Sequence, residues 1–415
     1  MKAPVLFLSM LLAALPARAE QTVSGSVLDA ATGEPIAAAT VTFAGTAVGT
    51  DGQGAFRSSG EGELVRVRAP GHRRTEVAAR DLVGPGAAIR LESFAPKALY
   101  LSNYGIATSS LRTPALRLVA ESELNALVID VKSDRGQVSY RSGVPLAAQV
   151  GAQNFIAIED VKGLLAPLKA DGIYLIARIV TFQDDRLARA RPDLAVSGPG
   201  GAPWRDRDGL AWSDPFQREV RDYNTDLAVE AASNGFDEIQ FDYVRFPDAK
   251  GLVFAGPNTR EARVQAIGDF LAEARRKLVP YNVFLSADVF GYVCWNFDDT
   301  GVGQLLEKLV PELDTLSPML YPSSFQFGIP GYRNPVQHPY EIVYLSLLHA
   351  KARTRLPGSR FRPWLQAFRD YAYDRRPFGA AEIRAQIRGA EDAGSDGWML
   401  WNPENVYSAD GLEKK

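Results

Sequence analysis

FDEIQFDYVRFPD, residues 236–248, is the stretch of sequence that decides the fold of this chain. Side chains of a β-strand alternate between two faces. Glu238, Gln240 and Asp242 therefore share one face, and the apolar side chains between them share the other. The apolar face can pack against helices, which leaves the polar face to point into a closed barrel. A carboxylate buried there without a partner would cost several kcal/mol, so a group of opposite charge is expected close by.

Two arginines can supply that opposite charge. Arg178 ends an earlier strand-like run, and Arg245 follows Asp242 on the same segment. A cation within a few ångströms favours the charged form of a carboxylate, so both are candidates for holding Asp242 ionised. A structural ion pair between Asp242 and Arg245, with no part in chemistry, is the alternative interpretation.

Around this segment the chain repeats a strand-then-helix pattern from residue 97 to its end. The helical patterns end near a glycine or a short loop, as is typical of a helix stop. Eight such units in roughly 320 residues favour a (β/α)₈ TIM barrel over a doubly wound sheet. The loop SNYGIATSS at 102–110 also lacks the glycine pattern of a dinucleotide-binding sheet. The predicted strands are 98–103, 126–131, 173–180, 238–243, 283–289, 315–321, 362–368 and 397–401.

The N-terminal part, residues 20–93, has a different pattern. Short β-prone runs follow one another every roughly 8 to 12 residues, separated by Gly, Pro and Asp, which is typical of a small antiparallel sandwich. The motifs GSVLDAATGEPIAAATVTF (25–43), TDGQGAF (50–56) and VRAPGH (67–72) resemble the carboxypeptidase regulatory-like domain, an Ig-like or transthyretin-like module. We assign no catalytic residue to this part, which leaves the chemistry to the barrel domain at 97–415.

Residues 1–19 are predicted to be a signal peptide. Lys2 supplies a positive start, 5–15 is an apolar run, and 17–19 fits a small-x-small cleavage motif. The apolar run is shorter than the ~20 residues that a helix needs to cross a bilayer, and no other segment is long and apolar enough. We therefore expect an exported protein, periplasmic or secreted.

Charge and composition exclude several classes of function. The net charge is -3, from 46 Lys+Arg against 49 Asp+Glu, so there is no basic excess for binding nucleic acid. The lone Cys294 cannot form an internal disulfide. Three histidines, none in a recognisable motif, argue against a zinc site or a Ser-His-Asp triad. We expect no metal and no cofactor, and the sequence does not indicate an oligomeric state.

Polar residues gather at the C-terminal ends of the predicted barrel strands, after mostly apolar runs. In a (β/α)₈ barrel these ends and their loops form one mouth, where the chemistry of such enzymes takes place. A purely structural barrel has no reason to gather charges on one rim. The residues are Asp130, Lys132, Arg178, Asp242, Asp288, Tyr321, Gln366 and Asn402.

Six segments carry a resemblance that covers most of residues 97–405. They are NALVIDVKSDRGQVSY (125–140), IYLIARIVTFQDD (173–185), FDEIQFDYVRFPD (236–248), LSADVFGY (285–292), LSPMLYPSSF (316–325) and DGWMLWNPENVY (396–407). Together they resemble the putative glycosyl hydrolase domain family, whose barrel is distantly similar to the alpha-amylase clan. The resemblance implies a barrel fold and a carbohydrate substrate.

Glycoside hydrolysis normally needs two carboxyl groups that flank the scissile bond. In the amylase-like arrangement they come from the ends of the fourth and fifth strands. The resemblance therefore implies that Asp242 is the nucleophile and Asp288 the general acid/base. That clan usually has Glu at the fifth strand, so Asp288 is a departure, and Glu404, after the eighth strand, is the reserve acid.

The other rim residues are candidates for binding the substrate. Polar side chains can hydrogen-bond sugar hydroxyls, and rings can stack on pyranose faces. The long connection 181–212 is expected to form a lid or wall over the mouth. The candidates are Asp130, Lys132, Arg178, Arg245, Tyr321, Gln366, Trp401, Asn402 and Glu404, with Trp204, Trp212, Tyr292 and Trp295 as further rings.

The sequence thus predicts a glycoside hydrolase that acts on a polysaccharide or oligosaccharide. One alternative is a barrel that binds envelope polysaccharide without cutting it, with the sandwich as a docking module. The two differ in whether two carboxyl groups face each other at roughly 5 to 10 Å. A deacetylase-like barrel is disfavoured because it needs an Asp and His metal cluster, and only His338, in a loop, lies near a strand end.

Overall fold

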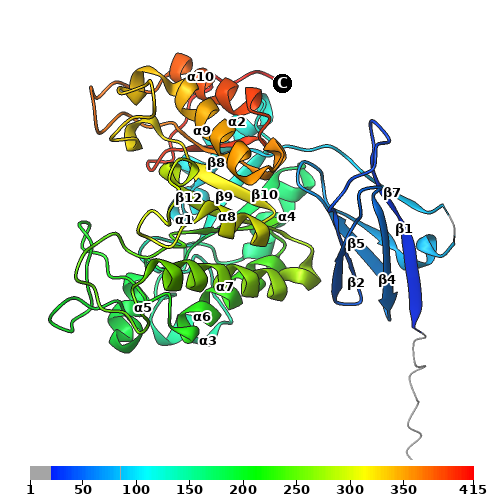
Figure 1. Cartoon of the computed structure of the whole chain (residues 1–415), viewed down its shortest axis with the longest axis horizontal. Helices are drawn as coiled ribbons and strands as arrows, with labels where there is room; N and C mark the ends of the chain where they lie inside the picture. Colours follow the sequence, from blue (N-terminus) through cyan, green and yellow to red (C-terminus); the bar gives the residue numbers. More distant parts are fainter. Residues whose placement is uncertain (1–19, 85) are drawn as a thin grey trace, which may run out of the picture.

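The computed structural model describes residues 20–84 and 86–415, which form a small β-sandwich and a larger barrel wrapped by helices (Figure 1). The predicted signal peptide lies outside the described residues. The predicted fold class, a TIM barrel preceded by a small all-β sandwich, is confirmed.

The sandwich consists of two sheets whose strand orders are β4-β1-β7 and β3-β2-β5-β6. Valines from both sheets, among them Val27, Val41 and Val65, are fully buried between them. β1 runs antiparallel to β4 but parallel to β7, so the predicted purely antiparallel pattern is wrong at that edge. The parallel pairing is possible because the chain builds the whole second sheet before β7 returns. The strands are β1 (Gln21–Asp29), β2 (Thr40–Phe43), β3 (Thr46–Gly49), β4 (Ala55–Gly60), β5 (Leu64–Arg68), β6 (Thr75–Ala78) and β7 (Ala88–Leu91).

The barrel is closed by eight parallel strands in sequential order, β8 to β15, with β15 paired to β8. All eight predicted strands are present, each within a few residues of its predicted bounds. They are β8 (Lys97–Leu101), β9 (Ala126–Lys132), β10 (Tyr174–Val180), β11 (Glu238–Asp242), β12 (Phe284–Phe290), β13 (Thr315–Met319), β14 (Trp364–Gln366) and β15 (Trp398–Trp401).

Helices surround the barrel, and their ends follow local sequence signals. The side chains of Asp160 and Thr259 cap the first turns of α4 and α7. Gly235 ends α6 in the left-handed conformation, with φ 109°, which glycine adopts without strain. The helices are α1 (Asn103–Ala107), α2 (Ser109–Glu121), α3 (Pro145–Gln149), α4 (Val161–Ala170), α5 (Asp185–Ala190), α6 (Arg218–Asn234), α7 (Arg260–Leu278), α8 (Leu306–Leu309), α9 (Pro339–Thr354) and α10 (Ala380–Asp392).

The interior of the barrel is a packed core with a charged lower layer. Glu238, at the start of β11, accepts hydrogen bonds on both oxygens from Arg362, at 2.9 and 2.7 Å. The hydroxyls of Tyr174 and Ser286 also donate to Glu238, and Arg362 pairs with Asp396 at 2.6 Å. We call Glu238, Arg362 and Asp396 the lower charge set. It lies at the N-terminal ends of the strands, opposite the predicted mouth.

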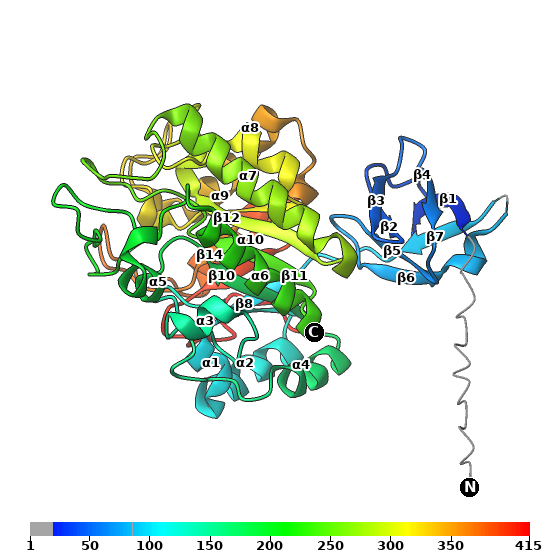
Figure 2. The ribbon, with the colours of Figure 1, turned by 90° about the horizontal axis from the view of Figure 1, so that it is seen from below.

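The sandwich also contacts the N-terminal side of the barrel (Figures 1 and 2). Arg74 pairs with Asp237 at 2.7 Å and donates to the carbonyl of Asn282, while Arg68 pairs with Asp314 at 3.3 Å. Asp237 and Asp314 directly precede strands β11 and β13. Because a TIM barrel performs its chemistry at the other end, this contact joins the two domains away from the predicted mouth.

Within 20–84 and 86–415, no helix combines the length and apolarity needed to span a membrane. The same residues contain no cluster of three His, Cys, Asp or Glu side chains suited to hold a metal ion.

Candidate active site

A cavity of about 170 Å³ opens at the C-terminal ends of the barrel strands. It combines two arginines and a carboxylate with a wall of aromatic and apolar side chains. Most binding sites for small molecules have this composition, an apolar lining with a few convergent polar groups. The lining residues are Arg178, Asp242, Tyr243, Arg245, Phe290, Met319, Tyr321, Trp364 and Trp401.

Asp242 ends β11 and is the carboxylate of this cavity. Its Oδ2 accepts hydrogen bonds from Nε and Nη2 of Arg178, at 3.0 and 2.5 Å. Its Oδ1 accepts the backbone N–H of Tyr243 at 2.6 Å. Tyr243 has φ 47°, a left-handed conformation that is uncommon for a bulky residue and is often found at functional sites. The chain thus turns sharply at the strand end and holds both carboxylate oxygens in place.

Arg178 links Asp242 to a second buried carboxylate. Its Nη1 donates to Asp130 at 2.6 Å, and the hydroxyl of Tyr100 donates to the other oxygen of Asp130 at 2.6 Å. Its guanidinium also lies 4.9 Å from the ring of Trp401. Burial raises the pKa of Asp130. Asp130 is only 2% exposed and does not line the cavity, so it orients Arg178 and is not placed to contact a sugar.

Asp288 lies on β12, beside Asp242. Phe241 pairs with Ala287 across the two strands, so the two aspartates follow in register, with backbones about 4.8 Å apart. Oδ1 of Asp288 accepts the indole N–H of Trp364 at 2.7 Å, and its buried Oδ2 has no hydrogen-bond partner. Burial, and then the charge of Asp242, raise the pKa of Asp288 well above its ordinary value. Such a carboxyl group favours its protonated form.

Asp288 is nevertheless shielded from the cavity that Asp242 lines. Its side chain is 1% exposed, and the rings of Trp364 and Tyr321 line the cavity instead. Burial, and then the charge of Asp288, raise the pKa of Tyr321. Proton transfer from Asp288 to a bound molecule therefore requires a side-chain movement that opens this shield.

Three predicted substrate-binding residues share the cavity with Asp242, namely Arg245, Tyr321 and Trp401. Arg178 lines it as well, but its donors hold the two carboxylates. The alternative interpretation of the sequence, an ion pair between Asp242 and Arg245, is wrong, because Asp242 pairs with Arg178. Arg245 lies among rings instead, 4.6 Å from Trp212. Trp212 ends the long connection 181–212 and forms the wall behind this arginine.

Four other predicted binding residues lie outside the cavity. Lys132 is fully buried in an ion pair with Asp184, at 2.7 Å. The amide of Gln366 is bonded to Ser323. The amide of Asn402 donates to the carbonyl of Ala367, directly after β14, and to the carbonyl of Val406 on its own loop. Structural contacts therefore occupy the polar groups of these three side chains. Glu404, the reserve acid, is exposed on the loop after β15, but it does not line the cavity.

Exposed apolar side chains around the mouth form a feature that the sequence analysis missed. Every large apolar side chain of the barrel that is described as exposed lies after the C-terminal end of a strand, on a loop or short helix. Phe327, after β13, is 86% exposed, and Tyr371, after β14, is 50% exposed. Aromatic rings in contact with water are suited to stacking on flat apolar faces of a ligand. The full set is Tyr104, Phe155, Val253, Phe297, Phe327, Tyr371 and Val406.

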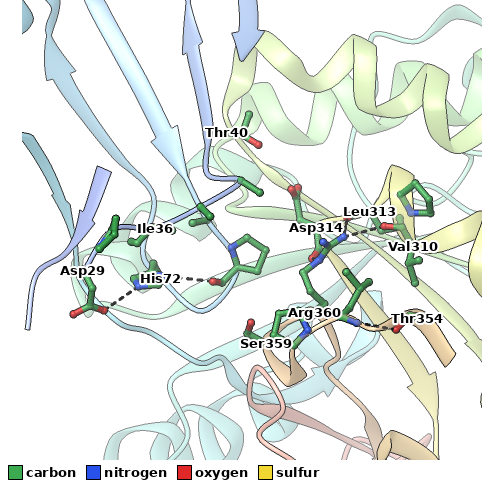
Figure 3. A pocket seen from close by; sticks show the side chains of 18 of the residues that line it. Asp29, Ile36, Thr40, His72, Val310, Leu313, Asp314, Thr354, Ser359 and Arg360 are labelled. Carbon is green, nitrogen blue, oxygen red and sulfur yellow. Dashed lines mark hydrogen bonds and ion pairs between the residues drawn. The ribbon is translucent and has the colours of Figure 1, made fainter. Parts of the chain in front are cut away.

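A larger cleft, of about 1090 Å³, lies between the sandwich and the N-terminal side of the barrel (Figure 3). Its polar groups bond mainly to one another. His72 lies 3.0 Å from Asp29, and Arg360 donates to the carbonyls of Leu313 and Asp314. We place the candidate active site in the smaller cavity, because it alone of the two lies at the C-terminal strand ends, where Asp242 lines it.

Two family models match the chain. One, described as a putative glycosyl hydrolase domain, matches residues 98–407, and the other, described as a domain of unknown function, matches 16–64. The first match spans nearly the whole barrel. The second neither supports nor excludes the carboxypeptidase regulatory-like resemblance, which stays a prediction. No curated protein matches the chain.

Two solved structures illustrate the similarity. A hypothetical protein from Ruminiclostridium thermocellum ATCC 27405 is 37% identical, and the match covers 46% of this chain and 97% of that protein, with a TM-score of 0.42. The PgaB (BpsB) glycoside hydrolase domain from Bordetella bronchiseptica is 14% identical, and the match covers 75% of this chain and 95% of that domain, with a TM-score of 0.54. At that identity the second structure supports the fold alone.

Proposed function

Because this chain belongs to the putative glycosyl hydrolase domain family, we propose that it hydrolyses glycosidic bonds of a polysaccharide or oligosaccharide through Asp242 and Asp288. One observation carries the proposal. Two neighbouring carboxyl groups at the barrel mouth have opposite environments, since Asp242 is ion-paired and Asp288 is buried with a raised pKa. Paired acids whose environments push their protonation apart supply the nucleophile and the acid of a glycosidase.

In the proposed first step, an oxygen of Asp242 forms a bond to the anomeric carbon as the bond to the glycosidic oxygen breaks. The leaving oxygen takes the proton of Asp288 after the rings of Trp364 and Tyr321 have moved to expose it. Water then attacks the anomeric carbon, displaces the Asp242 carboxylate and gives a proton back to Asp288. Both residues return to their starting states, and the net reaction consumes one water molecule.

This double displacement keeps the anomeric configuration of the first-formed product, and proton NMR of the fresh product measures it.

A barrel that binds carbohydrate without cutting it is the second candidate. The observation in its favour is the burial of Asp288 beside Trp364, away from the cavity surface. In that case the aromatic rim and the two arginines would hold a sugar chain, and the buried acid would be a remnant without access to substrate.

Reducing-end release from a panel of bacterial and plant polysaccharides separates the two candidates. The wild-type protein is compared with Asp242→Asn, Asp288→Asn and, as a matched control, Glu404→Gln. A glycosidase of the proposed kind loses release in both aspartate variants and keeps it in Glu404→Gln, with all proteins folded by circular dichroism. Binding of one polymer by the wild type and the two aspartate variants, without release by any of them, supports the binding barrel.

We also propose that the enzyme acts outside the cytoplasm, as the predicted signal peptide suggests. Fractionation of cells that express the full chain, followed by N-terminal sequencing, tests this. A mature protein that begins near Glu20 in the periplasm or medium is the expected result, and an uncleaved cytoplasmic chain contradicts it.

A further inference from the structure

Among residues 20–84 and 86–415, Arg245 is a cation of the cavity that makes no ion pair with a carboxylate. Its guanidinium lies 4.6 Å from the rings of Trp212 and Phe290 and 5.0 Å from the ring of Tyr243. Its one described hydrogen bond runs from Nη1 to the carbonyl of Phe246, at 3.1 Å. A guanidinium has five N–H donors, so within the described part of the chain most donors of Arg245 have no protein acceptor.

Arg178 and Arg362, the two arginines inside the barrel, differ from Arg245 because each is paired with two carboxylates. Arg178 holds Asp130 and Asp242, and Arg362 holds Glu238 and Asp396. Against the effect of burial, these carboxylates raise the pKa of both guanidinium groups. Burial instead lowers the pKa of Arg245, because no neighbouring charge compensates it fully. Arg245 is thus a partly desolvated charge that makes no direct ion pair among the described residues, although the carboxylates of Asp242, Asp248 and Asp206 act on it from farther away.

The position of Arg245 points to an anion on the ligand. It follows Asp242 by three residues and lines the same cavity, whose volume of about 170 Å³ is well below the roughly 300 to 1,000 Å³ of pockets for drug-sized ligands. A single sugar unit fits this space better than a longer segment. Both oxygens of Asp242 are already bonded, to Arg178 and to the backbone of Tyr243, so Arg245 is not needed to hold that carboxylate.

We propose that the cavity takes a sugar unit with a carboxylate, a uronic acid, and that Arg245 binds this carboxylate. The inference rests on the proposed function, since it names the substrate class of the same site. A guanidinium matches a carboxylate with two parallel hydrogen bonds. The flanking rings cover parts of the guanidinium with apolar surface, where such a pair is stronger than in water. A neutral sugar would leave Arg245 unpaired, and an amino sugar would add a like charge.

Matched polysaccharides test the proposal. Polygalacturonate, alginate and glucuronoxylan are each used in native form and after chemical reduction of their carboxyl groups to alcohols. Binding is measured by affinity electrophoresis with full-length protein in the Asp242→Asn background, so that cleavage does not interfere, and reducing-end release is measured separately without that substitution. The variants are Arg245→Gln and Arg245→Lys, with Arg80→Gln on the sandwich as a control for the loss of one positive charge.

We expect at least one native polymer to bind more tightly than its reduced form, by roughly 10- to 100-fold. Arg245→Gln removes this preference, so that native and reduced polymers bind it equally. Arg245→Lys keeps part of the preference, because it keeps the charge and loses the paired donors. Arg80→Gln behaves as its parent protein does.

The outcomes separate this inference from the proposed function. A carboxylate preference that Arg245→Gln leaves intact overturns the inference, as does a protein that prefers neutral or amino sugars. Cleavage of such sugars leaves the glycosidase proposal standing. Binding that needs the carboxylate and Arg245, with no cleavage of any polymer, supports the inference and overturns the proposed function. If Arg245→Gln fails to fold, native and reduced polymers are compared on the parent protein and on Arg245→Lys. An equal preference for the native polymer in these two proteins overturns the inference.

Discussion

The barrel holds two sets of charged side chains at its two ends, and only the set at the mouth has members that line one of the two cavities described above. In the lower charge set, both oxygens of Glu238 are bonded to Arg362 and to neighbouring hydroxyls. In the set at the mouth, Arg178 bonds Asp130 and Asp242, but the neighbouring Asp288 keeps a buried oxygen without a partner. In the lower charge set, Asp396 likewise keeps one buried oxygen without a described partner. It lies at the N-terminal ends of the strands, whereas Asp288 lies behind the rings of the cavity that Asp242 lines.

The difference teaches which charges serve stability and which serve chemistry. Removing one partner of a buried ion pair lowers the stability of the protein strongly, because the other charge then stays buried without a partner. A carboxylate that lines a cavity is open to a ligand, whereas one enclosed by the barrel core interacts with protein groups alone. The lower charge set therefore fixes the register of the strands, and the set at the mouth performs the proposed reaction.

The largest expected effect comes from two matched amides on β11. Asp242→Asn should lower the turnover number by roughly 10⁴-fold, because an amide cannot act as the nucleophile. It should also lower the free energy of unfolding by roughly 1–3 kcal/mol, through its weakened bonds to Arg178. Glu238→Gln, on the same face of the same strand, should keep activity within about tenfold. It should lower the free energy of unfolding by roughly 1–3 kcal/mol through its weakened bonds to Arg362. Kinetics on the cleaved polymer and urea denaturation measure the two effects.

Equal losses of activity in the two folded variants would contradict this division, because the lower set would then take part in the chemistry. Loss of stability in Asp242→Asn with full activity would reverse the assignment of the two sets.

The next effect concerns Asp288 and has opposite signs for activity and stability. Its native pKa is raised above the unfolded value. Below the unfolded pKa both states hold the proton, and between the two values only the native state does, so stability falls as pH rises through that window. Asp288→Asn removes this cost. It should flatten the dependence of the midpoint of thermal unfolding on pH, stabilise the protein at neutral pH and lower kcat by roughly 10²- to 10⁴-fold.

Activity of the wild type should also fall as pH rises above the pKa of Asp288, because the proton donor is then ionised. A variant that is less stable than the wild type at neutral pH, with an unchanged pH slope, would show that Asp288 is structural.

The barrel and its inward carboxylates were predictable from the sequence, because they depend on patterns within single strands. Apolar runs of the right length gave all eight strands, and the period of two put Glu238 and Asp242 on one face. Lys132 was mispredicted because β9 contains an irregularity. The pairing of β9 with β10 shifts between Arg178 and Ile179, so that Ile179 pairs with Lys132 and one extra residue turns the lysine to the outer face.

The remaining errors lie in contacts between loops, which one sequence does not encode in a readable pattern. Gln366 points to a turn after β13 and bonds Ser323, and Asn402 binds the backbone of its own loop. The exposed rings were missed for the same reason, since a Phe in a loop is as compatible with burial as with exposure. Arg178, the partner of Asp242, was one of the two predicted candidates because it lies near the C-terminal end of a neighbouring strand.

A smaller effect is expected at the exposed rings that follow the C-terminal ends of the barrel strands. Phe327→Ala and Tyr371→Ala should each weaken binding of long polymers by roughly 2- to 10-fold, the loss of one stacking contact. They should leave the cleavage of short substrates unchanged, because the rings lie outside the cavity. Leu64→Ala, an exposed apolar residue of the sandwich, is the matched control. Equal losses for short and long substrates would place these rings at the reaction centre.

The smallest effect is expected at the junction with the sandwich. Arg74 is partly exposed and pairs with Asp237, directly before β11. An ion pair that water reaches contributes about 1 kcal/mol or less, so Arg74→Met should lower the unfolding midpoint by no more than a few degrees. Activity should not change, because Asp237 and Asp242 lie at opposite ends of the same strand. Thermal unfolding measures the midpoint, and reducing-end release measures the activity. Cleavage of the linker at 92–96 by a protease shows whether the substitution loosens the junction. A fall in activity without a fall in stability would mean that the sandwich transmits its position through β11 to the mouth.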